Sequence, residues 1–233
     1  MRFSQNNDIS CLLTSIYYIF LKGVERILYR KVFKRVLSVI IAFCGIVILF
    51  PLMILIGLII KIADKGEVLF KQERLGKNQE IFTIYKFRTM VENAYDIGGT
   101  HTYEGDFRIT PVGTFLRKTS LDELPQLFNI LRNDMTIIGP RPILPEEFGS
   151  FVDNYTYGRR FDVLPGMFCT VDCEYRATAS RETQFEMDVD YIDNISAKLD
   201  FNIFFKILIA VIKRKNVYKQ PGEHILTTKD MSN

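Results

Sequence analysis

An apolar run at residues 36–60 dominates the pattern of hydrophobic and polar positions along the chain. Ser38 is its only polar side chain, and the run carries no charge. As a helix, a segment of this length extends about 37 Å, which exceeds the roughly 30 Å hydrocarbon layer of a bilayer. The run therefore predicts a helix embedded in a membrane.

Pro51 lies inside this run and predicts a kink, because proline removes one helical hydrogen bond and its ring clashes with the preceding turn. Basic residues flank both ends, with six of them at 22–35 and then Lys61, Lys65 and Lys71. Since Lys and Arg favour the cytoplasmic side of a membrane, this arrangement favours a re-entrant helix that bends at Pro51 and returns to the same face. The alternative is a helix that crosses the membrane, which would place one basic cluster outside.

Shorter patterns after the apolar run predict a small hairpin and several helices. β-Rich runs at 68–70 and 81–85 are separated by Gly76-Lys77-Asn78, which is typical of a turn. Residues 91–105 are polar and predict a loop, and Pro165-Gly166 predicts a turn. Helices are expected at 113–118, 121–133, 145–160, 182–197 and 201–215.

The last of these helices has an apolar body and ends on Lys213-Arg214-Lys215. That pattern suits a helix of the core, and it equally suits a helix that lies in the surface of a membrane. The pattern alone does not choose between the two.

Composition disfavours several classes of site. The chain has 233 residues, a net charge of +3 and four cysteines. His101 and His224 stand alone, and no cysteine pair has zinc-finger spacing with a histidine partner. These features disfavour a structural zinc site, a disulfide framework and a His-based catalytic triad. They favour reduced thiols in the cytoplasm.

Polar residues are densest between 106 and 142, where the acidic pair Asp122-Glu123 stands out. One interpretation is a capping box, because Ser120 and Glu123 have the required spacing. Pro125 complicates that interpretation, since it would fall at the fifth helical position. The alternative is a helix that starts near Asp122 or is distorted there, which leaves two carboxylates beside free backbone N–H groups.

Many basic residues lie near this pair in the sequence, and arginine forks match phosphate oxygens. These basic residues are Lys86, Arg88, Arg108, Arg117, Lys118, Arg132 and Arg141. Two acids among many cations beside a membrane segment suggest phosphate chemistry with a divalent metal ion. In such chemistry a carboxylate can serve as the nucleophile toward phosphorus.

Several longer motifs occur in one order along the chain. They are Gln72-x-Arg74-x-Gly76, Tyr85-Lys86-Phe87-Arg88-Thr89-Met90, Asp106-x-Arg108-Ile109-Thr110-x-Val112-Gly113, residues 116–127 (LRKTSLDELPQL), Gly139-Pro140-Arg141-Pro142, Pro165-Gly166 and residues 188–194 (DVDYIDN). Over about residues 32–215 the chain thereby resembles the bacterial sugar transferase family, the monotopic phosphoglycosyl transferases. The resemblance implies transfer of a sugar-1-phosphate from a UDP-sugar to undecaprenyl phosphate with release of UMP. Such a reaction starts a capsule, O-antigen, exopolysaccharide or glycoprotein glycan.

The resemblance also implies roles for single residues. Asp122 matches the nucleophile that forms a covalent phosphosugar intermediate, Glu123 matches its partner, and Mg²⁺ is expected near Asp122. The family uses a re-entrant helix broken by proline, which Pro51 fits. The candidate substrate-binding residues are Lys86, Arg88, Arg117, Arg141 and Arg176.

The chain departs from the family pattern at two places. Phe50 stands where the family often has serine before the helix-breaking proline. After Pro165-Gly166, Asp172 and Tyr175 replace a glutamine and a glycine, while Arg176 keeps its place. An acidic residue near a phosphate pocket is expected to alter the preference for sugar or nucleotide, or to reduce activity.

The expected fold is α+β and mainly helical, with a small β-hairpin or sheet, a re-entrant proline-broken membrane helix and interfacial amphipathic helices. The expected location is the bacterial inner membrane, with the catalytic domain on the cytoplasmic face. The expected segments are a basic, amphipathic interfacial segment at 1–35, the membrane-embedded helix at 36–60, a cytoplasmic catalytic domain at 61–218 and a C-terminal tail at 219–233.

The expected partners are a UDP-sugar, undecaprenyl phosphate, membrane lipid and downstream glycosyltransferases, but not nucleic acid. Two other functions stay open at this point. One is a non-catalytic membrane scaffold or regulator that retains the family fold. The other is a conventional glycosyl transferase, which would release UDP instead of UMP.

Overall fold

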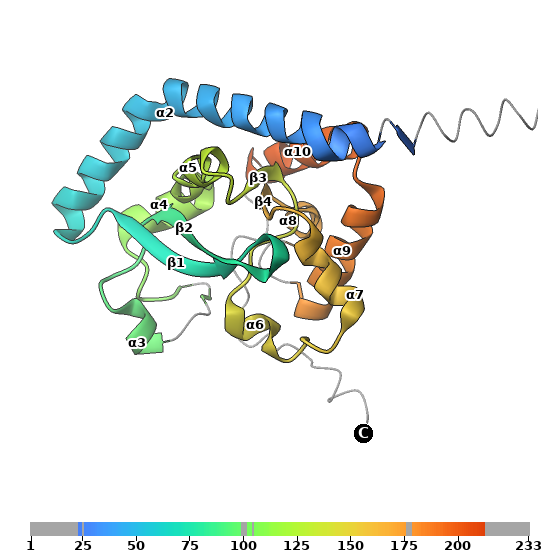
Figure 1. Ribbon diagram of the computed structural model, residues 1–233. Helices are drawn as coiled ribbons and strands as arrows, with labels where there is room; N and C mark the ends of the chain where they lie inside the picture. The colour runs from blue at the N-terminus through green and yellow to red at the C-terminus, as the bar shows by residue number, and fades with distance from the viewer. Residues whose placement is uncertain (1–22, 25, 99–101, 104, 176–178, 213–233) are drawn as a thin grey trace, which may run out of the picture.

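Figure 1 shows the computed structural model, which describes residues 23–24, 26–98, 102–103, 105–175 and 179–212. The described part is mostly helical and holds two small two-stranded sheets. It therefore confirms the expected class, α+β and mainly helical. One long helix, α2 (Lys34–Asp64), arches over the other elements.

α2 continues from a π-helical turn, η1 (Tyr29–Phe33), so helical backbone runs across the expected segment boundary between residues 35 and 36. Pro51 lies inside α2, and the helix continues on both sides of it. Figure 1 shows α2 curved, with its concave side toward the other elements. A break at Pro51 and re-entry into a membrane stay predictions. The expected C-terminal tail lies outside the described residues.

The concave side of α2 packs into two apolar clusters with the rest of the chain. Ala42 belongs to the first cluster, and Met53, Ile56 and Ile60 belong to the second. Gly45 permits a close approach, because a Cβ there would lie 3.3 Å from a methyl carbon of Leu127. The inner side of α2 is therefore part of the hydrophobic core.

The outer side of α2 is apolar and exposed. Within the described residues, the stretch 26–64 is the one helix long and apolar enough to cross a membrane, by length and composition. An exposed apolar surface of this size is typical of a contact with a membrane or a partner. Its exposed large side chains include Val36, Leu37, Ile40, Ile41, Phe43, Val47, Ile48, Phe50, Ile54, Leu55, Leu58, Ile59 and Ile62.

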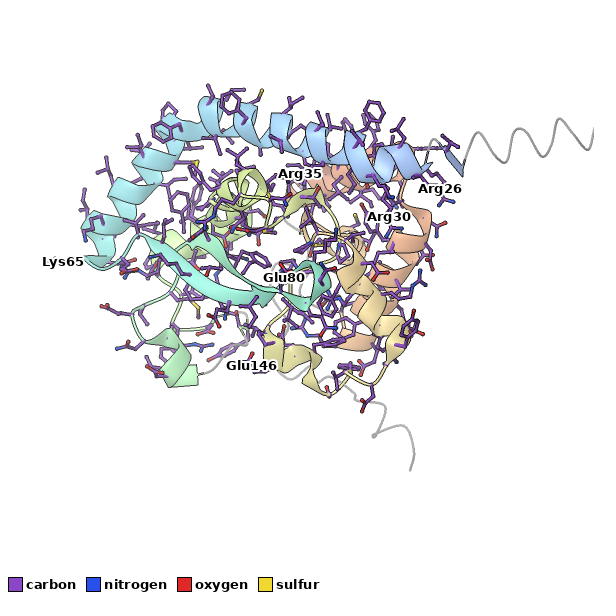
Figure 2. All side chains as sticks on the ribbon, in the orientation of Figure 1. Arg26, Arg30, Arg35, Lys65, Glu80 and Glu146 are labelled. Carbon is purple, nitrogen blue, oxygen red and sulfur yellow. The ribbon has the colours of Figure 1, made fainter. Side chains whose placement is uncertain are left out.

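The basic residues at the start of this helix divide into two groups. Figure 2 shows Arg26 and Arg30 near its N-terminal end and Arg35 toward the other elements. Arg35 donates to two backbone carbonyls at 3.0 and 2.7 Å. Lys34 is buried, and its Nζ lies 2.5 Å from Oδ2 of Asp200. Lys34 and Arg35 therefore make contacts within the protein and anchor the start of α2 to the other elements.

The expected hairpin is confirmed. β1 (Leu69–Leu75) and β2 (Ile81–Phe87) pair in antiparallel fashion and are joined by a 3-10 turn at Lys77–Gln79. Because side chains alternate along a strand, Ile84 and Lys86 share one face of β2. That face turns toward the site described below.

The second sheet has no signal in the sequence pattern. β3 (Thr136–Ile138) and β4 (Gly166–Phe168) pair in parallel, so Gly166 begins a strand where the sequence predicts a turn. Only glycine fits there, because a Cβ on Gly166 would lie 2.1 Å from the amide nitrogen of Gly139. The pairing brings the chain after β3 beside the chain after β4.

Four expected helices are present, with shifted ends. They are α4 (Pro111–Thr119), α5 (Gln126–Leu131), α9 (Arg181–Asn194) and α10 (Ala197–Ile212). α10 buries Ile203 and Ile207 in the core and exposes Phe201, Phe205 and Leu208. One face of α10 is thus a core face, as one interpretation of the pattern held. Contact of its exposed apolar face with a membrane surface stays a prediction.

Two element predictions are wrong in part. The stretch 145–160 is divided into α6 (Pro145–Gly149), α7 (Tyr155–Gly158) and the 3-10 turn η4 (Arg159–Asp162). Asn154 starts a new helix there, since its side chain accepts a hydrogen bond from the backbone of α7. The predicted loop at 91–105 contains a short helix, α3 (Ala94–Gly98).

Candidate active site

The acidic pair Asp122-Glu123 lies on a 3-10 turn, η3 (Leu121–Glu123), between α4 and α5. Ser120 ends α4 with a left-handed φ of 56°, and its side chain makes no capping hydrogen bond. Pro125 is the residue just before α5, where its missing N–H costs nothing. The capping-box interpretation is therefore wrong, and the pair lies at an irregular helix start.

Two leucines beside the acidic pair attach this turn to α2. Leu124 is buried and Leu121 is half-buried, and both belong to the cluster that contains Met53, Ile56 and Ile60. Full burial of a leucine side chain stabilises a protein by about 1.5–3 kcal/mol, so Leu124 contributes on that order and the half-buried Leu121 contributes less. The backbone of the acidic pair is therefore held against the inner side of the long apolar helix.

Lys86 of β2 pairs with Glu123 at the edge of the hairpin. Its Nζ lies 2.7 Å from Oε1 of Glu123, and the two side chains are 24% and 21% exposed. Ion pairs that reach solvent in this way contribute little to stability. Lys86 and Glu123, both predicted for the site, therefore contact each other. Their ion pair orients the two side chains and adds little to the stability of the fold.

Asp122 has an altered acidity. Burial and the neighbouring Glu123 carboxylate raise the pKa of Asp122 from 3.8 to about 6, while the cations Lys86 and Arg117 oppose that rise. Arg117 of α4 is held in place by a hydrogen bond from its Nε to Oγ1 of Thr89, at 2.8 Å. A carboxylate with such a pKa is ionised at neutral pH yet more basic than an ordinary one, which suits a nucleophile.

A pocket opens beside Glu123, and residues of both sheets and of α5 line it. Three of its side chains are cationic and one is acidic, so it suits an anionic ligand. The lining residues are Arg74, Ile84, Lys86, Glu123, Gln126, Arg141, Pro142, Gly166 and Met167.

A larger hollow, of about 310 Å³, lies on the other face of β2. Thr83, Tyr85 and Arg132 line it, and neither member of the acidic pair does. Arg132 is thereby separated from the pocket beside Glu123, although the sequence places it among the basic residues around the pair.

Arg74 lines the pocket but was not predicted as a binding residue, and in the sequence it stands out only as part of the motif Gln72-x-Arg74-x-Gly76. Its Nη2 donates to Oε1 of Gln72 at 2.6 Å, since residues two apart on a strand share a face. Burial lowers the pKa of Arg74 to about 10. Its Nε is buried without a hydrogen-bond partner among the described residues. Gln126 is similarly buried at the pocket.

Arg141 lies on the loop that follows β3, and two contacts hold it. Its backbone carbonyl accepts a hydrogen bond from Nη2 of Arg160 at 2.6 Å, and Arg160 is itself paired with Asp188 at 2.7 Å. Both partners of that second pair are buried, and burial raises the pKa of Asp188 to about 6. The Arg141 guanidinium meets Asp172, with Nη1 2.7 Å from Oδ1.

Three further basic residues do not line the pocket, and they include the predicted binding residues Arg88 and Arg117. Arg88 is buried against Gly66, where a Cβ would lie 2.0 Å from its Nη1, and it does not line the pocket. Arg108 is buried in an ion pair with Asp106, with Nη2 2.6 Å from Oδ2. The predicted binding residue Arg176 lies outside the described residues.

Within the described ranges, no group of three or more His, Cys, Asp or Glu side chains could hold a metal ion by itself. Mg²⁺ does not require such a group, because it keeps several waters and binds through one or two carboxylates and the phosphates of a substrate. Asp122 fits that role, since its crowding by Glu123 would be relieved by a divalent cation. A magnesium site at Asp122 stays a prediction.

Comparison with known families matches residues 29–214 to the family described as bacterial sugar transferase. The chain belongs to the bacterial sugar transferase family. The matched range includes α2, the acidic pair, the pocket and α10 up to its last described residue. The bacterial sugar transferase motifs recognised in the sequence therefore coincide with the elements that build the site.

Three relatives illustrate the similarity. A UDP-N-acetylgalactosamine-undecaprenyl-phosphate N-acetylgalactosaminephosphotransferase of Aeromonas hydrophila is 36% identical over 214 residues, which cover 88% of this chain and 47% of the relative. The exopolysaccharide production protein ExoY of Sinorhizobium fredii is 35% identical over 203 residues, 79% of this chain and 88% of the relative. A UDP-glucose:undecaprenyl-phosphate glucose-1-phosphate transferase of Klebsiella pneumoniae is 33% identical over 197 residues, 81% of this chain and 42% of the relative. The chain thus spans about half the length of the first and third relatives and most of the length of the second.

Proposed function

We propose that this protein is a phosphoglycosyl transferase that moves a sugar-1-phosphate from a UDP-sugar to undecaprenyl phosphate and releases UMP. The observation that carries the proposal is that Glu123 lines a pocket with the cations Lys86, Arg74 and Arg141, while Asp122 precedes Glu123 on the same 3-10 turn. The names of the relatives from Aeromonas and Klebsiella support this class of donor and acceptor.

The reaction has two displacements at one phosphorus. A carboxylate oxygen of Asp122 attacks the sugar-side phosphorus of the donor, the bond from that phosphorus to the bridging oxygen breaks, and UMP leaves. The sugar phosphate then remains on Asp122 as an acyl phosphate. A phosphate oxygen of undecaprenyl phosphate attacks the same phosphorus, and Asp122 leaves as a free carboxylate.

The other residues of the site prepare Asp122 and hold the donor. Glu123 keeps Asp122 basic through its negative charge, and Lys86 fixes Glu123 in place. Arg74 and Arg141 offer N–H donors to the phosphates. Mg²⁺, when bound with the donor, would neutralise phosphate charge and orient the transferred group.

We place the enzyme at the bacterial inner membrane, with the pocket on the cytoplasmic side, where nucleotide sugars are made. The exposed apolar side of α2 supports contact with lipid, and the cations Arg26 and Arg30 at its start suit anionic headgroups. The lipid-linked product is a substrate for glycosyltransferases that extend the glycan.

Substitution Asp122→Asn tests the proposal directly. Wild-type protein in nanodiscs, with undecaprenyl phosphate, Mg²⁺ and UDP-N-acetylgalactosamine, UDP-galactose or UDP-glucose, should release UMP and acquire the mass of one phosphosugar. The variant should lose the adduct and about 10³-fold or more of UMP release, because removal of a nucleophile has effects of this size. Asp153→Asn, at an exposed position away from the pocket, is the matched control and should keep wild-type turnover.

Other products would identify the alternatives. Release of UDP in place of UMP would indicate a conventional glycosyl transferase. Wild-type turnover in the Asp122→Asn variant would refute the assigned nucleophile. Absence of any nucleotide product from the wild type across the donor panel would favour a membrane scaffold.

A further inference from the structure

Arg141 and Asp172 meet because two short strands pair in parallel. β3 and β4 place Ile138 opposite Phe168, so the loop after β3 and the helix after β4 leave the sheet at the same edge. Asp172 belongs to that helix, α8 (Thr170–Glu174). The ion pair between Arg141 and Asp172 is therefore a product of the topology and joins residues far apart in the sequence.

The two ends of Arg141 are held differently. Its backbone is fixed from below by Arg160, which is 2% exposed. Its side chain is 37% exposed and lines the pocket with Lys86 and Glu123, whereas the side chain of Asp172 is only 15% exposed. Arg141 thus lines the pocket, whereas its counter-ion Asp172 is less exposed and does not line it.

Asp172 is the strongest electrostatic partner of Arg141. Its carboxylate raises the pKa of the Arg141 guanidinium, with weaker contributions of the same sign from Cys169, Glu123 and Glu147. Arg74, another pocket cation, has its own acidic neighbour in Glu147. A phosphate that enters the pocket therefore meets an Arg141 whose charge is already partly neutralised.

One bond from Nη1 leaves the arginine fork incompletely used. A guanidinium has five N–H donors and Asp172 accepts from Nη1, so the remaining donors can still bind a phosphate. A carboxylate at 2.7 Å both aims the guanidinium and competes with any phosphate for it. A neutral amide at the same place would aim the guanidinium without opposing the phosphate charge.

We propose that Asp172 is a positioning residue that sets how tightly the pocket holds nucleotide phosphate: it aims Arg141 at the pocket and weakens its grip on the donor and on released UMP. The inference rests on the proposed function, because it assigns the anion in the pocket to the nucleotide phosphates of that reaction. It predicts a pocket tuned toward release of UMP rather than toward maximal affinity.

The test is Asp172→Asn in the full chain in nanodiscs, since asparagine keeps the shape and removes the charge. The dissociation constant for UMP, measured by calorimetry, should fall about three- to tenfold, and the KM for the UDP-sugar should fall with it. The kcat should not rise, because Asp172 is not proposed to touch the reacting phosphorus. The gain in affinity should shrink at high salt, since partly exposed charges are screened.

Asp162→Asn removes one negative charge at an exposed position of η4 outside the pocket and is the matched control. It should leave the affinity for UMP unchanged. In an Arg141→Met background, Asp172→Asn should have a clearly smaller effect, because most of the effect acts through Arg141. An unchanged or weaker affinity in Asp172→Asn, or an equal gain without Arg141, would overturn the inference.

The outcomes separate this inference from the proposed function. If the wild type releases UMP from a UDP-sugar and the Asp172→Asn variant binds UMP as the wild type does, the inference alone fails. If the wild type neither binds UMP nor produces it, the proposed function fails and the inference falls with it.

Discussion

Two arginine–aspartate ion pairs have nearly equal N···O distances but differ in their exposure to solvent. In the pair Arg108–Asp106 the atoms are 2.6 Å apart, and the side chains are 2% and 0% exposed. In the pair Arg141–Asp172 the distance is 2.7 Å, and the side chains are 37% and 15% exposed. The first pair is covered by neighbouring groups, and Arg108 also donates to the backbone carbonyl of Ala94, whereas the second pair presents its cation to a pocket.

The comparison extends to a second example of each kind. Arg160–Asp188 is enclosed, with both side chains at most 1% exposed. Lys86–Glu123 is open, with side chains that are 24% and 21% exposed. An enclosed pair is costly to break, because the remaining charge is left buried. An open pair is cheap to break, because water solvates the charge that remains. Exposure toward the pocket, rather than residue type or distance, therefore distinguishes Lys86 and Arg141 from the enclosed cations Arg108 and Arg160.

The largest expected effect comes from breaking an enclosed pair with Arg108→Met. Asp106 would be left buried without its main partner, so the free energy of unfolding should fall by about 3–5 kcal/mol. Thermal unfolding in detergent should shift down by roughly 10 °C. Arg132→Met, whose side chain is 63% exposed, is the control and should change stability by about 0.5 kcal/mol or less. Equal losses in the two variants would break the comparison.

Breaking an open pair with Lys86→Met should have the opposite signature. Turnover should fall about 10²-fold, the usual cost of removing one electrostatic group from an active site. The melting temperature should change by only about 2 °C, because partly exposed pairs add little stability. Lys71→Met, on the neighbouring strand and exposed, is the control for both measurements. A large loss of stability with normal turnover of the folded fraction would place Lys86 among the structural cations.

The smallest expected effect is a shift in pH dependence. Asp122 must be ionised to attack, and its pKa is raised to about 6, so kcat/KM should decrease as the pH falls through that value. Lys86 lowers the pKa of Asp122, so Lys86→Met should move this acidic limb to higher pH. The measurement is UMP release between pH 5 and pH 8 in both proteins. A limb that stays in place in the variant would show that Lys86 does not act on Asp122.

Local patterns explain which parts of the fold the sequence predicts well. The apolar run 36–60, the hairpin and the closing helices α9 and α10 each follow from residues within one segment. The second sheet was beyond such patterns, because β3 and β4 have three residues each and pair across the intervening helices. Short strands of this kind carry too few residues for a period of two to be recognisable.

The candidate site divides in the same way. The acidic pair, Lys86 and Arg141 were recognisable from composition and motifs, and Pro125 already counted against a simple capping box. Arg88 belongs to the same class of residue by sequence, yet it is buried against Gly66 and does not line the pocket. Nothing in a linear pattern distinguishes a cation that faces a pocket from one that is enclosed.

By itself the sequence determined a membrane-length apolar helix, a mainly helical α+β chain and an acidic pair among basic residues, since each depends on neighbours along the chain. Only the tertiary structure decided that the inner side of α2 holds the turn carrying Asp122-Glu123 and that Lys34 and Arg35 make contacts within the protein. The contact between Asp172 and Arg141 was likewise decided by the tertiary structure alone. The physical reason is that burial and ion pairing depend on which distant segments pack together. Packing decides how much solvent and which partners a charged side chain contacts, and these contacts determine its role.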